Sequence, residues 1–141
     1  MTTLITGAAG FIGMHVAAAL LARGGRVIGI DNFTPYYSLE LKRARVAHLA
    51  ACYGDQFAFK DVDFGDANAL AQALANVKID RIVHLGAQPG VRYSLENPAA
   101  YIHSNISGHL NILELARHRT ISHLVYASSS SVYGDTPKLP S

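Results

Sequence analysis

The sequence is short of cysteine, of charge and of long apolar runs. Its 141 residues include one cysteine and no tryptophan, and only 16% are charged. One cysteine excludes an intramolecular disulfide and favours a reducing compartment, and we expect Cys52 to be a buried thiol. The longest apolar stretch, around 16–22, lies between His15 and Arg23 and is too short to span a membrane. The chain enters its first strand within a few residues, which leaves no room for a signal peptide, and we expect a soluble, cytoplasmic protein.

The weak charge also limits the possible partners. The net charge is only +2, and the one basic cluster, Lys42, Arg43 and Arg45, suits the solvated face of a helix. We therefore expect no nucleic-acid partner. The seven histidines show no ligand spacing beside a cysteine or carboxylate cluster, so we also expect no metal site. Half of the residues are hydrophobic, which is enough for one domain with a real core.

Short apolar runs and helical patterns alternate along the chain. This alternation predicts an α/β fold, a Rossmann-type doubly wound parallel sheet with helices on both faces. The sequence ends soon after the fifth strand of this pattern. Strands are predicted around Leu4–Ile5 and at 26–31, 57–62, 80–85 and 123–127, helices at 11–23, 39–52, 67–75 and 98–118, and a long polar loop at 86–97.

The most informative stretch is TGAAGFIG, which follows the first strand and opens the first helix. Its three glycines, Gly7, Gly10 and Gly13, suit a sharp strand-to-helix turn that lets the backbone approach a pyrophosphate. The free N–H groups of the helix would then point at the phosphates. A tight turn without any ligand has the same glycine spacing, so this motif alone does not decide between the two.

An acidic residue supports the dinucleotide interpretation. Asp31 ends the second strand, at the place where such folds hydrogen-bond the adenosine ribose. Because a carboxylate repels a 2′-phosphate, Asp31 favours NAD over NADP. Further polar groups follow other strands, among them Asp63 and the serines at 128–131. Since parallel strands end at one edge of a sheet, we expect all these groups to meet there. Tyr36 and Tyr37 could edge the adenine pocket or simply cover the sheet.

Three stretches carry a resemblance to a known family. TGAAGFIG, HLGAQPGVRYSLENPAAYIHSNISGHLNILELARH (84–118) and YASSSSVYG (126–134) resemble the extended short-chain dehydrogenase/reductase family. Within that family the chain is most similar to NAD-dependent nucleotide-sugar epimerases acting on UDP-glucuronate or UDP-galacturonate, and VRYSLENP is its most specific segment.

The resemblance implies a role for each matching position. The glycine turn matches the pyrophosphate loop, and the turn after the fourth strand matches the segment beneath the nicotinamide. Ser129 matches the catalytic serine or threonine. The implied cofactor-binding residues are Gly7, Gly10, Phe11, Ile12, Gly13, Asp31, Asn32, Asp63, Phe64, Leu85, Gly86, Ala87, Gln88, Asn105, Ala127 and Ser128, and the implied substrate-binding residues are Arg92, Ser94, Ser129 and Ser130.

The implied chemistry is oxidation of a sugar C4 hydroxyl by bound NAD, followed by return of hydride to the opposite face. It needs a base, which the family supplies as the tyrosine of a Tyr-x-x-x-Lys motif. That motif is absent here: Pro137 lies four residues after Tyr133, and Lys138 comes one position too late. We therefore expect the N-terminal, cofactor-binding part of an epimerase, without its substrate domain and inactive alone.

Several alternatives stay open at this point. A UDP-glucose 4-epimerase, a nucleotide-sugar 4,6-dehydratase and a decarboxylase would share this part of the chain. A non-catalytic NAD-binding module that controls a partner is an alternative of another class. The resemblance also implies that the full-length protein is a homodimer through the helix at 98–118, where we expect an exposed apolar patch beside an open strand edge.

Overall fold

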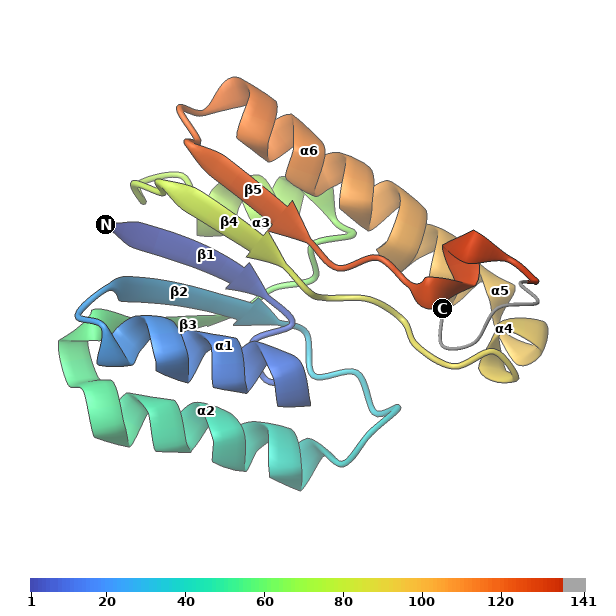
Figure 1. The fold of residues 1–141 in the computed structure, drawn as a ribbon, viewed down its shortest axis with the longest axis horizontal. Helices are drawn as coiled ribbons and strands as arrows, with labels where there is room; N and C mark the ends of the chain where they lie inside the picture. The colour runs from blue at the N-terminus through green and yellow to red at the C-terminus, as the bar shows by residue number, and fades with distance from the viewer. Residues whose placement is uncertain (136–141) are drawn as a thin grey trace.

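A computed structural model describes residues 1–135 of the chain. Five parallel strands form one sheet in the order β3-β2-β1-β4-β5 (Figure 1). The predicted Rossmann-type fold is confirmed, and every predicted strand is present. The strands are β1 (Thr2–Thr6), β2 (Arg26–Asp31), β3 (Phe57–Asp61), β4 (Arg81–His84) and β5 (His123–Tyr126). Pro137 and Lys138 lie outside the described residues.

Helices cover both faces of the sheet and create two separate cores. Successive side chains of a strand point to opposite faces. Leu4 therefore belongs to the core that includes Ile112 of α6, whereas Ile5 belongs to the core that includes Leu49 of α2. The helices of the first face are α3 (Ala67–Ala73) and α6 (Gly108–His118), and those of the second are α1 (Phe11–Ala22) and α2 (Leu39–Tyr53).

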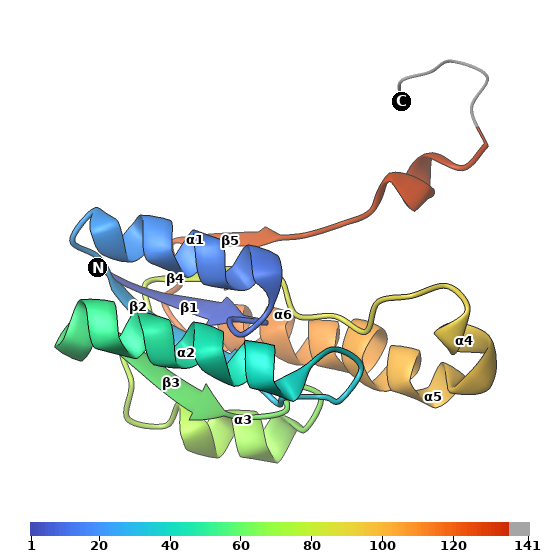
Figure 2. The same ribbon diagram turned by 90° about the horizontal axis from the view of Figure 1, so that it is seen from below.

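The segment between β4 and β5 differs most from the prediction. The polar loop expected at 86–97 contains the short helix α4 (Tyr93–Glu96), and the helix expected at 98–118 is not uniform. It begins as α5 (Pro98–Tyr101), with Pro98 in the first turn as predicted, widens into the π-helical segment η2 (Ile102–Ser107), and continues as α6. Both α4 and α5 lie beyond the carboxyl ends of the strands (Figures 1 and 2). Two 3₁₀ turns, η1 (Gly54–Gln56) and η3 (Ser130–Tyr133), complete the described chain.

Two predictions about single side chains of α2 are wrong. Cys52 is exposed rather than buried, and Lys42 is only 7% exposed rather than part of a solvated face. The cause is the helical period: Lys42 and Leu49, seven residues apart, both turn toward the sheet, whereas Cys52 falls outside that stripe. The structure therefore removes Cys52 from the core and brings Lys42 inside.

The expected apolar patch is present along η2 and α6. Ile102, Ile106, Leu110 and Leu113 are each at least 39% exposed, and their spacing places them on one side of the helical rod. Val125 and Tyr126 of the edge strand β5 are also exposed. Within residues 1–135, no helix has the length and apolar character needed to cross a membrane, and no three potential metal ligands gather into a cluster.

Candidate functional site

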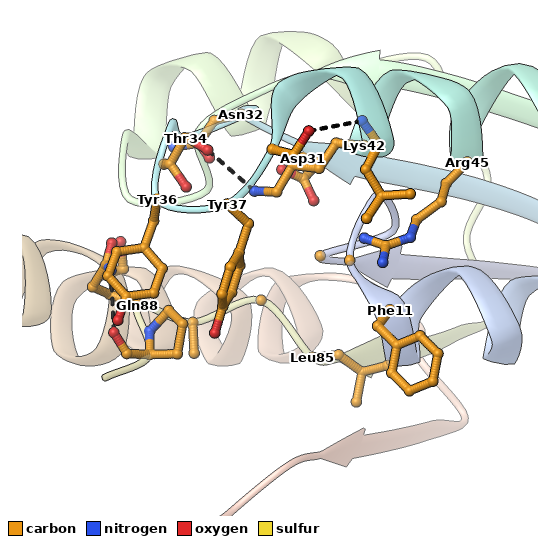
Figure 3. Close-up of a pocket in the computed structure, with 18 of the residues that line it drawn as sticks. Phe11, Asp31, Asn32, Thr34, Tyr36, Tyr37, Lys42, Arg45, Leu85 and Gln88 are labelled. Carbon is orange, nitrogen blue, oxygen red and sulfur yellow. Dashed lines mark hydrogen bonds between the residues drawn. The ribbon is translucent and has the colours of Figure 1, made fainter. Parts of the chain in front are cut away.

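One pocket of about 540 Å³ opens at the carboxyl ends of β1, β2 and β4 (Figure 3). It is the place where ligands bind in open parallel sheets. Its walls come from the β1–α1 turn, the β2–α2 loop, the first turns of α2 and the segment after β4. The predicted cofactor residues that line it are Gly7, Gly10, Phe11, Asp31, Asn32, Phe64, Leu85, Gly86, Ala87 and Gln88.

The glycine turn is shaped by close backbone contacts. Gly7 has a positive φ of 68°, and a Cβ on it would lie 2.9 Å from the Cα of Gly86. A Cβ on Gly13 would lie only 2.0 Å from the carbonyl oxygen of Gly7. Gly13 and Ile12 do not line the pocket, and Gly13 instead allows α1 to pack closely on the turn. No side chain caps the N-terminus of α1 at Gly10, which leaves its first N–H groups available to an anion.

Asp31 joins the glycine turn to the loop that follows β2. The residue is 8% exposed, and its Oδ2 accepts a hydrogen bond from the Ala9 N–H at 3.2 Å. Its Oδ1 accepts one from the Phe33 N–H at 3.0 Å. Phe33 has a positive φ of 52°, a backbone strain that this hydrogen bond helps to hold. A carboxylate has further lone pairs, so Asp31 can still accept hydrogen bonds from a ligand in the pocket.

Two basic side chains, which the sequence analysis placed on a solvated face, line the same pocket. Lys42 Nζ donates to the Thr34 carbonyl at 3.3 Å, and Arg45 Nη1 donates to the Ala9 carbonyl at 3.1 Å. Figure 3 shows both side chains extending from α2 into the pocket. A signal for them was available, because Lys42 and Arg45 share a helical face with Leu49, which is fully buried.

The two aromatic residues left open by the sequence analysis, Tyr36 and Tyr37, line the pocket. Their rings pack edge to face, with centroids 4.8 Å apart. They descend from the β2–α2 loop toward Gln88 (Figure 3). Of the two interpretations, the structure places these rings at the pocket edge rather than over the sheet.

Asp63 and Phe64 are neighbours in sequence but differ in their relation to the pocket. Phe64 lines the pocket, whereas Asp63 does not. Asp63 Oδ1 accepts a hydrogen bond from the Gly65 N–H at 2.8 Å, and its Oδ2 lies 2.7 Å from His103 Nε2 of η2. Asp63 is therefore tied to its own turn and to the π-helical segment.

The segment after β4 is anchored from two sides. Thr6 Oγ1 accepts hydrogen bonds from the N–H groups of Leu85, at 3.0 Å, and Gly86, at 2.9 Å, and lies 2.6 Å from Nδ1 of His84. Farther along, the Gln88 N–H donates to Asn105 Oδ1 at 2.8 Å, and Asn105 Nδ2 donates back to the Gln88 carbonyl at 3.1 Å. Asn105 thus holds the pocket wall without lining it. Thr6 is not among the predicted site residues, and His84 is predicted only as a hydrogen-bonded core or near-site residue of a strand.

Comparison with known proteins now identifies the family. The sequence profile described as GDP-mannose 4,6 dehydratase matches residues 4–141. The chain belongs to this family. UDP-glucuronate 4-epimerase 4 of Arabidopsis thaliana is 47% identical over 141 residues, which make up 99% of this chain and 32% of that protein. An uncharacterised 37.6 kDa protein of Escherichia coli O111:H- is 49% identical over 140 residues, 99% of this chain and 41% of that protein. The chain therefore spans less than half the length of these relatives.

Solved structures agree with this family. UDP-glucuronic acid 4-epimerase from Bacillus cereus, in complex with UDP-glucuronic acid and NAD, matches with a TM-score of 0.84 and 35% identity, over 98% of this chain and 43% of that one. UDP-glucose-4-epimerase from Stenotrophomonas maltophila, with bound NAD, matches with a TM-score of 0.84 and 29% identity, over 100% of this chain and 40% of that one. The predicted resemblance to NAD-dependent nucleotide-sugar epimerases is thereby confirmed.

In this member of the GDP-mannose 4,6 dehydratase family, the predicted substrate and serine residues stand apart from the pocket. Ser129 caps η3, its Oγ accepting a hydrogen bond from the Ser131 N–H at 3.1 Å, and Ala127 N–H donates to the His84 carbonyl at 3.1 Å. Ser94 Oγ donates to the Val91 carbonyl within its own turn. None of the following lines the pocket: Arg92, Ser94, Ala127, Ser128, Ser129 and Ser130. Their roles stay predictions.

The buried histidine of this family member makes its stability depend on pH. Burial, together with the nearby His109, lowers the pKa of His84 from its usual 6.5 to about 4. Between these two values the unfolded chain binds a proton that the folded chain does not. We therefore expect the free energy of unfolding to fall as pH drops from 6.5 to 4, by up to about 3 kcal/mol from this group.

Urea unfolding at several pH values in this window measures the effect. The slope against pH should flatten more in His84→Asn than in His15→Gln, which replaces an exposed histidine of α1. Equal slopes in the protein and in His84→Asn would contradict the assignment.

Proposed function

We propose that the chain is the NAD-binding region of a nucleotide-sugar 4-epimerase. One observation carries the proposal: the glycine turn and Asp31 form adjoining walls of a single pocket at the carboxyl ends of the strands. The residues fit a dinucleotide. The turn has no room for a Cβ at Gly7 or Gly13, so it packs closely between α1 and Gly86, while Gly10 lines the pocket and the uncapped N-terminus of α1 favours an anion there.

Different residues of the pocket bind different parts of the cofactor. Gly10 and the N-terminus of α1 bind the pyrophosphate, Asp31 accepts hydrogen bonds from the adenosine ribose, and the turn 85–88 lies under the nicotinamide half. Bound NAD supplies the hydride acceptor and donor for C4 of the sugar. Ser129 orients the C4 hydroxyl, and Arg92 and Ser94 face the sugar nucleotide. The sequence offers no Tyr-x-x-x-Lys motif, so the base is contributed by residues beyond this chain.

The proposed substrate is UDP-glucuronate or UDP-galacturonate. The support is the 47% identity to the Arabidopsis thaliana UDP-glucuronate 4-epimerase. Among solved structures, identity is 35% to the Bacillus cereus UDP-glucuronic acid 4-epimerase and 29% to the Stenotrophomonas maltophila UDP-glucose-4-epimerase. We propose that residues 1–141 form the cofactor-binding domain of a longer cytoplasmic protein. A separate substrate domain would complete the sugar site, and this chain alone would not turn over sugar.

Calorimetric titration tests the function directly. The 141-residue chain is titrated with NAD and, separately, with UDP-glucuronate, after its circular dichroism spectrum has shown a folded protein. Binding of NAD but not of the UDP-sugar is the expected result. A folded chain that binds neither would overturn the proposal. If the chain binds NAD, joining it to a substrate domain of a relative distinguishes an epimerase part from a non-catalytic NAD-binding module, because only the first gains activity.

The apolar patch on η2 and α6 supports a homodimer as part of this proposal. We expect the chain to associate as its concentration rises, because association removes the exposed apolar surface of the patch from water. Ile106→Glu, within the patch, should shift the protein toward monomer in sedimentation velocity. Leu95→Glu, at an even more exposed apolar position on α4, should leave the distribution unchanged. A protein that stays monomeric at every concentration would exclude this interface.

A further inference from the structure

The carboxyl ends of the adjacent strands β1 and β4 meet in a buried pair of side chains. Thr6 ends β1, His84 ends β4, and the two residues are partners in the parallel register. Thr6 is fully buried and His84 is 5% exposed. Their side chains touch through Thr6 Oγ1 and His84 Nδ1, 2.6 Å apart. Both a hydroxyl and an imidazole can donate or accept, so the distance alone leaves the position of the protons open.

The neighbouring backbone settles where the hydroxyl proton lies. Thr6 Oγ1 receives the N–H groups of Leu85 and Gly86, which can only donate. A hydroxyl has two lone pairs and one proton. Because both lone pairs are taken by the two amides, the single proton must point at His84 Nδ1. Nδ1 therefore carries no proton, and the neutral ring carries its proton on Nε2.

The surroundings of His84 agree with a neutral ring. In residues 1–135 no carboxylate forms an ion pair with it. Its ring packs edge to face on Phe64, with centroids 5.0 Å apart, and lies 5.3 Å from the ring of His109 on α6. Tyr126 of β5 follows behind His109. The titratable groups that face His84 are thus another imidazole and, beyond it, a phenol, and neither favours an imidazolium.

We propose that His84 is a positioning residue of the cofactor pocket: as the neutral Nε2–H tautomer it accepts, at Nδ1, a hydrogen bond from the Thr6 hydroxyl, which leaves both lone pairs of that oxygen to the amides of the turn 85–86. The proposal rests on the proposed function in one respect, that this turn lies under a bound cofactor. A protonated His84 would present an N–H to an oxygen with no free lone pair, and one of the two amides would lose its acceptor.

The turn at 85–87 also has close neighbours in the glycine turn and in Phe64, which leave it little room to move. Leu85, Gly86 and Ala87 line the pocket. The backbone of Gly86 lies so close to Gly7 that a Cβ added to Gly7 would lie 2.9 Å from the Cα of Gly86. The Phe64 ring closes the third side of Gly86, 2.5 Å from where its own Cβ would be. Thr6, oriented by His84, holds the turn through the amides of Leu85 and Gly86. Loss of the Thr6 hydroxyl would therefore alter the pocket wall formed by the glycine turn and the segment after β4.

Two measurements without any ligand test the tautomer and the hydrogen bonds. Nitrogen-15 NMR of the histidine rings in the 141-residue chain at neutral pH should show His84 as the neutral Nε2–H form, and a proton on Nδ1 would overturn the proposal. Amide exchange should be about tenfold faster or more at Leu85 and Gly86 in Thr6→Val, which keeps the shape and removes the hydroxyl. Thr6→Ser, which keeps the hydroxyl, should retain the protection, and the strand amides of Ile5 and Val83 serve as internal controls.

A titration with NAD separates the positioning role from the proposed function. Thr6→Val should raise the Kd for NAD about tenfold, while Thr6→Ser and His84→Asn, whose Oδ1 can replace Nδ1 as the acceptor, should stay within about threefold of the unmodified chain. If Thr6→Val speeds exchange equally at Ile5 and Val83, the hydroxyl stabilises the whole sheet and the positioning role is wrong. If even the unmodified chain binds no NAD, the proposed function fails, and the NMR and exchange results still decide the role of His84.

Discussion

Gly13→Ala is expected to destabilise the protein by at least about 3 kcal/mol and to abolish NAD binding. The new Cβ would lie 2.0 Å from the carbonyl oxygen of Gly7 and 2.8 Å from its carbonyl carbon. Both neighbours are backbone atoms, so α1 must move away from the turn that it covers. On an exposed helix the same change would stabilise by about 1 kcal/mol, because alanine is the better helix former. The expected sign is therefore opposite to that of intrinsic propensity.

Gly10→Ala is the matched control, from the same turn and with the same added methyl group. Its Cβ would meet the Gly7 carbonyl oxygen at 3.1 Å, a contact that small shifts relieve. We expect it to cost less than about 1 kcal/mol of stability, yet to weaken NAD binding, because the methyl group faces the proposed pyrophosphate. Urea unfolding and NAD titration of both variants give the two readouts. Equal stability losses in Gly13→Ala and Gly10→Ala would contradict the packing argument.

The elements of the sheet were predictable because their signals are local. Leu4 and Ile5 are adjacent and bury themselves on opposite faces, as a strand covered on both sides requires. The glycine spacing and Asp31 lie at strand ends, and every parallel strand of one sheet ends at the same edge. Order along the chain was therefore sufficient to place the glycine turn and Asp31 in one pocket.

The groups that sequence reasoning missed are those whose partners are distant in the chain. Thr6 meets His84 across 78 positions, and Arg45 meets Ala9 across 36. Neither partner can be inferred from local spacing. Lys42 was missed for another reason: a lysine is usually solvated, and only its helical phase relative to Leu49 indicates the pocket. The π-helical turn at 102–107 left no trace in composition, although it brings His103 to Asp63 and Asn105 to Gln88.

Because Lys42 is buried in the pocket beside Asp31, we expect substitution of Asp31 to change the cofactor preference. Asp31→Asn is expected to weaken NAD binding about 10- to 100-fold, because the ribose loses a charged acceptor and one carboxylate oxygen becomes an NH₂ donor that faces the Ala9 or Phe33 N–H. It should strengthen NADP binding at the same time. The carboxylate repels a 2′-phosphate, and its removal leaves two cations, Lys42 and Arg45, in the same pocket. Asp31→Ala should also narrow the preference for NAD, with a larger loss of stability than Asp31→Asn, since the Ala9 and Phe33 amides both lose their acceptor and the asparagine leaves one of them paired.

Titrations of the variants with both cofactors, each at low and high salt, measure this change. A gain in NADP affinity that comes from charge should shrink as salt rises, because ions screen the attraction. Adding Lys42→Met to Asp31→Asn keeps much of the side-chain volume and removes one cation, so it should reverse most of the gain. Arg43→Met, on the neighbouring exposed position, should not. Unchanged affinities for both cofactors in Asp31→Asn and Asp31→Ala would remove Asp31 from the site, whereas a gain for NADP that survives Lys42→Met would assign the phosphate to Arg45.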